Sequence, residues 1–208
     1  MRFRRWYYDR FSRFYDRFVQ AHSKDSAESL RSFLAETLQL KPGHTVLDLC
    51  TGTGSSALAA ARHEGVRVIG IDFSLGMLRE ALRKSPPENA PFWVQADVQM
   101  LPVGDATADR VSCSYAIYEL SREVRNRMLS EVVRVLKPGG RFVMMEHLPP
   151  EKPLVRLLYV IRIYVLGTRG VRSFAGSEEA ELKRFFAATG TIVAPSGRTK
   201  AVYGTKAE

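Results

Sequence analysis

The sequence predicts an α/β fold in which helices cover both faces of a mostly parallel β-sheet. Apolar runs alternate with amphipathic stretches from residue 45 to residue 146, which is the pattern of successive strand–helix units. Glycine and proline separate several of these units, as in KPG at 41–43 and KPGG at 137–140. The 208 residues, 45% of them hydrophobic, are enough for one domain with a full core.

The chain is expected to begin with two helices. Aromatic residues from Phe3 to Phe18 recur at steps of three and four residues, which is a helical period. Asp25 and Glu28 suit the start of a second helix at 26–40. The expected strands of the central region are the apolar runs 45–50, 66–71, 92–96, 110–115 and 141–146.

Helices are expected between these strands and after them. Residues 55–63 are rich in alanine, and Ser74 and Ser121 are suited to cap the helices that follow them. A last helix is expected from Ser177 to Gly190. After it, residues 191–194 and 200–205 are expected to pair as antiparallel strands around a Pro-Ser-Gly turn.

The net charge of +9 is concentrated in two segments. Residues 1–24 carry seven basic and two acidic groups, residues 151–175 carry five and one, and the remainder of the chain is balanced. Arginines beside an aromatic stripe are typical of a helix at a membrane interface, so an anionic membrane surface is an expected partner. The alternative is that the stripe packs on the sheet and the arginines are merely exposed. Nucleic acid is not an expected partner, because no recognition motif accompanies the charges.

The cysteine content and the start of the chain bear on its location. The two cysteines, Cys50 and Cys113, have no CxxC spacing, which argues for a reducing compartment and against a structural metal site. Residues 1–10 contain no apolar core of a signal peptide. Cytoplasmic location, with peripheral binding at the inner membrane face, is therefore expected.

A glycine loop follows the first strand of the sheet. Gly52 and Gly54 would let backbone N–H groups approach a ligand closely. The loop also fits the dinucleotide pattern GxGxxA, with Asp72 twenty residues after Gly52, so a nicotinamide or flavin is an alternative ligand. A nicotinamide oxidoreductase is disfavoured because the chain has no Tyr-x-x-x-Lys pair.

Three aspartates at successive strand ends select among the ligands. Asp48 would repel a pyrophosphate but suits an ammonium group. Asp72 could accept hydrogen bonds from both hydroxyls of a ribose, and Asp97 from the amine of an adenine. One cofactor carries these groups in this order, namely S-adenosylmethionine, which leaves as S-adenosylhomocysteine after methyl transfer.

With these features the sequence resembles the class I S-adenosylmethionine-dependent methyltransferases. The matching stretches are VLDLCTGTG at 46–54, GIDFSLGML at 70–78, QADVQMLP at 95–102 and RVLKPGGRF at 134–142. The resemblance implies a Rossmann-like three-layer sandwich with a mostly parallel seven-stranded sheet and an antiparallel last strand. It also implies a single domain, 1–208, with N-terminal helices at 1–40, a cofactor-binding core at 41–150, a lid at 151–175 and a C-terminal helix and strand pair at 176–208.

The resemblance further implies a set of cofactor-binding residues. They are Asp48, Cys50, Thr51, Gly52, Gly54, Asp72, Phe73, Met77, Asp97, Val98 and Ser114, with Tyr15 closing over the cofactor. Cys50 stands where the family usually has glycine. Met77 could equally be a residue of the hydrophobic core.

Within the family, the chain looks most like the ubiquinone/menaquinone C-methyltransferases and small relatives that act on lipids. The features in common include SLGML at 74–78 and EHLP at 146–149. Where the quinone group has aromatic-Gly-Leu-Arg-Asn after the fourth strand, this chain has YAIYE at 115–119. The expected acceptor is a small hydrophobic or lipid-like molecule. The alternatives are quinone-ring C-methylation, phospholipid amine N-methylation, and a regulatory protein that binds the cofactor without catalysis.

Three residues are candidates for the acceptor side of the site. His147 follows the fifth strand at the ligand edge of the sheet and is the candidate general base. Tyr115 and Tyr118 follow the fourth strand and could orient the acceptor. Each of the three could instead be a packing residue.

Overall fold

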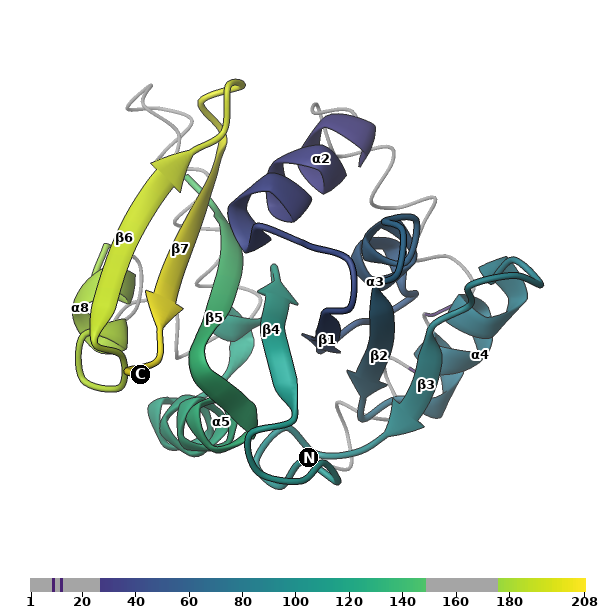
Figure 1. Ribbon diagram of the computed structural model, residues 1–208. Helices are drawn as coiled ribbons and strands as arrows, with labels where there is room; N and C mark the ends of the chain where they lie inside the picture. Colours follow the sequence, from purple (N-terminus) through teal and green to yellow (C-terminus); the bar gives the residue numbers. More distant parts are fainter. Residues whose placement is uncertain (1–8, 10–11, 13–26, 149–175) are drawn as a thin grey trace.

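The computed structural model describes residues 9, 12, 27–148 and 176–208, and within this part of the chain it forms one seven-stranded sheet with the order β3-β2-β1-β4-β5-β7-β6 (Figure 1). The strands are β1 (Thr45–Leu49), β2 (Arg67–Asp72), β3 (Phe92–Gln95), β4 (Ala108–Ser114), β5 (Leu136–His147), β6 (Ala188–Val193) and β7 (Thr199–Thr205). The pairs among β1 to β5 are parallel, and β7 is antiparallel to both of its neighbours. This confirms the predicted fold class and the antiparallel last strand.

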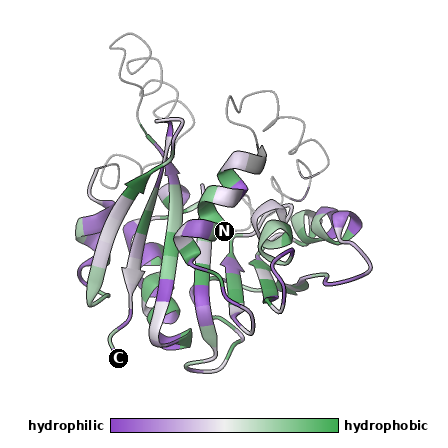
Figure 2. Cartoon of the chain, turned by 45° about the horizontal axis from the view of Figure 1, so that its top comes forward, coloured by the Kyte–Doolittle hydropathy of each residue, from purple (hydrophilic) through white to green (hydrophobic). Residues whose placement is uncertain are grey.

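Helices cover both faces of the sheet, as predicted. They are α2 (Ala27–Leu38), α3 (Ser55–Ala60), α4 (Leu75–Lys84), the 3-10 turn η1 (Ile117–Glu119), α5 (Arg122–Val135) and α8 (Glu178–Leu182). Strands and helices both carry hydrophobic and hydrophilic residues (Figure 2). Burial differs across the sheet, because the central strand β1 is covered on both sides and is almost wholly buried, whereas the edge strand β6 is largely exposed.

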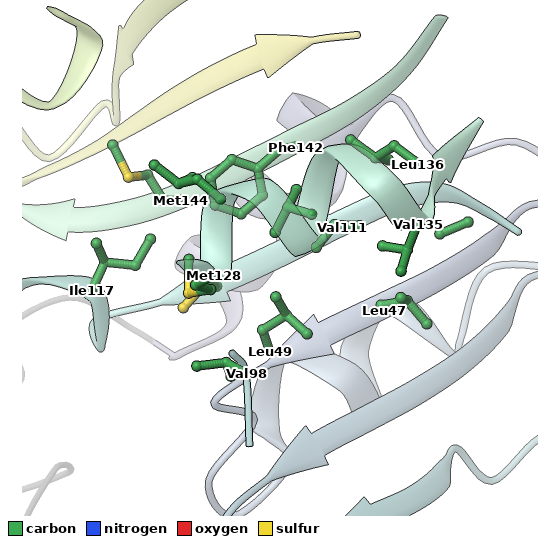
Figure 3. Packing of buried hydrophobic residues seen from close by; sticks show 14 of the residues in the cluster. Leu47, Leu49, Val98, Val111, Ile117, Met128, Val135, Leu136, Phe142 and Met144 are labelled. Atoms are coloured by element: carbon green, nitrogen blue, oxygen red, sulfur yellow. The ribbon is translucent and has the colours of Figure 1, made fainter. Parts of the chain in front are cut away.

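Two hydrophobic layers separate the helices from the sheet. On one face, Phe33 and Leu38 of α2 pack against Val143 and Met145 of β5, and α3 packs on β1 and β2. On the other face, the cores of α5 and α8 pack against the residues of β4 and β5 that alternate with these. Figure 3 shows this second layer, in which Met128 of α5 lies among side chains of the sheet. The alternation of side chains along β5 thus assigns each residue to one face.

The C-terminal region differs from the prediction. The helix expected to run to Gly190 ends at Leu182, because the chain enters β6 at Ala188 and pairs with β7 from there to Val193. The register with β7 decides this boundary, and it is a tertiary contact that helical spacing cannot reveal. α3 also ends at Ala60, three residues earlier than expected.

Several predictions concern residues outside the described part of the chain. This group contains the aromatic stripe of the N-terminal helix, the cofactor role of Tyr15 and the basic lid at 151–175, which all stay predictions. Of residues 1–26, the structure describes Asp9 and Ser12. The division into four parts stays a prediction as well. Among the helices that the structure describes, none has the length and apolar character needed to cross a membrane.

Candidate functional site

The loop between β1 and α3 turns sharply through left-handed backbone. Cys50, Gly52 and Gly54 have φ angles of 52°, 55° and 79°. A Cβ atom on Gly54 would lie 2.5 Å from the ring of Trp93 and 2.9 Å from Cβ of Ala81, whereas a Cβ on Gly52 would have no atom within 4 Å. Gly54 therefore lets the loop pack against β3 and α4, and Gly52 borders open space that a ligand could occupy.

Asp48 ties this loop to the sheet. Its carboxylate is 1% exposed and accepts hydrogen bonds from Oγ1 of Thr51 at 2.6 Å and Oγ of Ser112 at 2.7 Å. The backbone N–H of Ala57 at the start of α3 also donates to it. Burial raises the pKa of Asp48 to about 6, although these hydrogen bonds favour the charged form. Asp48 therefore fixes the loop and supplies a buried negative charge beneath it.

Asp72 closes the same loop from the end of β2. Its Oδ2 accepts from the N–H of Gly52 at 2.9 Å and its Oδ1 from the N–H of Ser74 at 2.8 Å. Burial raises the pKa of Asp72 to about 6, and the negative charge of Asp9 adds to the effect. Two predicted cofactor residues, Gly52 and Asp72, are thus in direct contact.

Asp9 is a site residue that the sequence analysis missed. Its Oδ1 accepts from Oγ of Ser74 at 2.6 Å and from the N–H of Gly76 at 2.9 Å, so it caps the N-terminus of α4 next to Asp72. Nothing in the sequence pairs Asp9 with a helix that begins more than sixty residues later. Ser74 also accepts from the N–H of Met77, as expected of a cap.

The residues expected to hold the adenine contact neighbouring residues of the chain. Asp97, at the end of β3, accepts from the N–H of Gln99 at 2.9 Å and from its side-chain amide, in a local turn. Phe73 is half-buried, and its carbonyl accepts from the side chain of Gln95. Met77 and Val98 are core residues with 2% and 8% exposure. For Met77, packing in the core is therefore the role that the structure displays.

The residues at the ends of β4 and β5, and just after β4, are the candidates for the acceptor side of the site. The rings of Tyr115 and His147 stack with centroids 4.4 Å apart, and the hydroxyl of Tyr115 lies 3.1 Å from Oγ1 of Thr199. His147 is exposed, and Tyr118 packs against the core of the α5 face. Ser114 accepts from Oγ of Ser56 at 3.3 Å, which links the end of β4 to α3. The structure brings Tyr115 and His147 together, and their catalytic roles stay predictions.

These residues fit an adenosyl amino acid. Asp48 and Asp72 are acceptors matched to an ammonium group and to hydroxyls, and both hold the loop whose Gly52 borders open space. Both carboxylates would bind these groups in their charged form, and the fraction of charged carboxylate decreases as the pH drops below about 6.

A pH dependence of cofactor affinity follows from these two groups. We expect the affinity for S-adenosylmethionine to fall about 10- to 100-fold between pH 7 and pH 5. The unliganded protein should show the opposite trend. The folded-state pKa values of about 6 exceed the ordinary value of 3.8 for an aspartate, so this contribution to stability is complete below about pH 4 and is lost as the pH rises to about 6. Calorimetric titration and chemical denaturation across this range measure the two trends, and parallel trends would contradict the assignment.

Comparison with known proteins identifies the family. Residues 46–140 match the family model described as a methyltransferase domain. The chain is 35% identical over 152 residues to the demethylmenaquinone methyltransferase of Clavibacter sepedonicus, covering 73% of this chain and 61% of the relative. It is 39% identical over 123 residues to the 2-phytyl-1,4-naphtoquinone methyltransferase of Nostoc punctiforme, covering 56% and 52%. The chain thus spans less than two thirds of the length of these relatives.

Solved structures share the fold. One chain of the complex between the Haloferax volcanii Trm112 methyltransferase activator and a methyltransferase superposes with a TM-score of 0.73 at 20% identity, covering 97% of this chain and 98% of that one. The Haemonchus contortus phosphoethanolamine N-methyltransferase 2, solved with S-adenosyl-L-methionine, superposes with a TM-score of 0.64 at 16% identity, covering 88% and 53%. With the glycine loop and the aspartates at the strand ends, these findings support a class I S-adenosylmethionine-dependent methyltransferase near the ubiquinone/menaquinone C-methyltransferase group.

Proposed function

We propose that this enzyme transfers the methyl group of S-adenosylmethionine to a small hydrophobic or lipid-like acceptor, with a quinone-derived ring as the first candidate. The contact between Asp72 and the N–H of Gly52 carries the cofactor half of the proposal, because it sets a buried carboxylate beside an open glycine loop. The curated relatives, which are named for demethylmenaquinone and a phytyl naphthoquinone, support the acceptor half.

The chain's residues contribute alignment and charge. S-adenosylmethionine, when bound, supplies an activated methyl group. Asp72 would hold the ribose, Asp97 the adenine amine, and Asp48 with its loop the amino acid end. Tyr115 and Tyr118 would orient the acceptor, and His147, which stacks on Tyr115, is one candidate to accept its proton.

The acceptor end differs from the quinone group at two positions. Tyr118 and Glu119 stand where that group has arginine and asparagine. A tyrosine and a carboxylate change both the charge and the hydrogen-bonding capacity offered to an acceptor. A ring with a different substitution pattern is therefore as good a candidate as demethylmenaquinone itself.

A methyl-transfer screen tests the proposal. The protein is incubated with methyl-labelled S-adenosylmethionine and, separately, a reduced naphthoquinone, a phospholipid amine, and a small phenol or thiol, and the organic extract is counted. We expect label in the quinol or another hydrophobic acceptor. Binding of the cofactor by calorimetry without transfer to any acceptor would favour the regulatory alternative. Sedimentation with anionic vesicles tests the proposed membrane association in the same preparations.

A further inference from the structure

Glu146 is a buried carboxylate that the site described above does not use. It is the penultimate residue of β5 and lies opposite Lys200 of β7 in the sheet register. Its side chain is on the α5 and α8 face, because Met145 packs on the α2 face and side chains alternate along the strand. The residue is 4% exposed, although it lies at the edge of the sheet where the cofactor loop and the acceptor residues meet.

One oxygen of this carboxylate is unsatisfied. Oε1 of Glu146 has no hydrogen-bond partner among the described residues, whereas the backbone N–H of Tyr118 donates to the carboxylate. Lys200 does not pair with it, since its Nζ binds Oε1 of Glu178 at 2.7 Å. A buried polar atom without a partner is rare in folded proteins and costs about 1–3 kcal/mol, so its retention calls for an explanation.

The surroundings make Glu146 a proton-binding group. Four titratable groups face it from the neighbouring elements: Glu178 of α8, Lys200 of β7, Glu119 after β4 and the buried thiol of Cys113 in β4. Burial, followed by the charge of Glu178, raises the pKa of Glu146 to about 8, and Lys200 offsets this only in part. Such a carboxyl group exchanges its proton close to neutral pH.

The position also links Glu146 to both halves of the site. A hydrogen bond with Cys50 of the glycine loop and burial raise the pKa of the Cys113 thiol, and the charge of Glu146 adds to the effect. The hydrogen bond from Tyr118 connects Glu146 to the turn that carries a predicted acceptor residue. The carboxylate therefore lies against the acceptor turn, and its charge acts on a thiol that is hydrogen-bonded to the cofactor loop.

We propose that Oε1 of Glu146 binds the proton-bearing group of the methyl acceptor, a hydroxyl or an acidic N–H, and takes its proton. This inference rests on the proposed function and deepens it. In the step, the O–H or N–H bond of the acceptor breaks, the proton moves to Oε1 of ionised Glu146, and the bonding electron pair stays on the acceptor atom, which becomes the nucleophile. His147 lies on the opposite face of β5, so it cannot replace Glu146 in this contact.

A binding experiment tests the inference without turnover. The probe is 1-naphthol, an aromatic hydroxyl donor, and its reference is naphthalene, which lacks the hydroxyl. Both are titrated into the protein loaded with S-adenosylhomocysteine, between pH 6.5 and pH 8.5. We expect the wild-type protein to prefer 1-naphthol about tenfold or more at pH 8.5, with the preference shrinking toward pH 6.5 as Glu146 binds its own proton.

Two variants make the result specific. Glu146→Gln keeps the size of the side chain and removes the ionisation, so the pH dependence of the preference should vanish. Glu146→Asp keeps the carboxylate and should retain part of the pH dependence. This variant decides the question even if Glu146→Gln is poorly folded. Glu88→Gln, at an exposed carboxylate of the loop before β3, is the matched control and should behave as wild type.

The outcomes separate this inference from the proposed function. A wild-type pH dependence in Glu146→Gln, or no preference for 1-naphthol in the wild-type protein, overturns the role of Glu146. If no acceptor in the screen is methylated, the proposed function is overturned. The preference for 1-naphthol over naphthalene still tests whether Glu146 binds a hydroxyl group. Binding of S-adenosylhomocysteine should be equal in all variants, because Glu146 is not placed on the cofactor.

Discussion

Replacing Asp72 with asparagine is expected to weaken the binding of S-adenosylmethionine about 100-fold. The aspartate accepts from the N–H groups of Gly52 and Ser74 with different oxygens, and an asparagine can accept with only one. Its amide nitrogen would then face a second N–H group, which would open the loop. The charged acceptor for the ribose hydroxyls is lost as well, and hydrogen bonds to charged groups contribute about 1.5–3 kcal/mol each. Calorimetric titration with the cofactor measures this loss.

The same substitution should change the stability of the unliganded protein little. Burial raises the pKa of Asp72 to about 6 from 3.8, so the buried charge costs about 3 kcal/mol at pH 7, and this cost disappears in the variant. The lost hydrogen bond offsets the gain in part, so the free energy of unfolding should shift by less than about 2 kcal/mol. Asp105→Asn, at an exposed carboxylate, is the control. Unchanged cofactor affinity in the Asp72 variant would refute the ribose assignment.

The sequence predicted the sheet well because its evidence is local. Apolar runs such as 45–50 and 66–71 are visible without any partner, and strand–helix alternation limits the topology to few arrangements. The glycine loop and the three aspartates were found for the same reason, since the carboxyl ends of parallel strands share one edge. The contact between Gly52 and Asp72 shows that this argument placed two residues twenty positions apart correctly.

The residues that were missed depend on contacts between distant segments. Asp9 caps α4 from the N-terminal segment, and Glu146 is distinguished by an oxygen that no neighbour satisfies. Neither property can be read from residue type or spacing. The end of α8 was missed for a similar reason, because pairing with β7 rather than helix propensity determines where β6 begins.

Two glycines of the cofactor loop are expected to respond very differently to alanine. Both have left-handed backbone, with φ angles of 55° at Gly52 and 79° at Gly54, so each substitution carries about 1–2 kcal/mol of backbone strain. At Gly52 the new Cβ meets no atom within 4 Å, and strain is the whole cost to stability. At Gly54 the Cβ would lie 2.5 Å from the ring of Trp93, so the glycine loop must move away from β3 and α4.

Gly54→Ala should therefore lower the free energy of unfolding by about 3–5 kcal/mol, and Gly52→Ala by about 1–2 kcal/mol. Denaturant titration of the two variants side by side measures the difference. Should Gly54→Ala not fold, the double variant Gly54→Ala with Trp93→Leu removes the nearer contact, leaves Cβ of Ala81 at 2.9 Å, and should recover part of the folded protein. The effect on cofactor affinity is expected to be larger for Gly52→Ala than for Gly54→Ala, because the new methyl group at position 52 occupies the open space beside the loop. Cofactor affinity should then fall in Gly52→Ala although the fold is nearly intact, and equal effects of both variants on stability would contradict this division of roles.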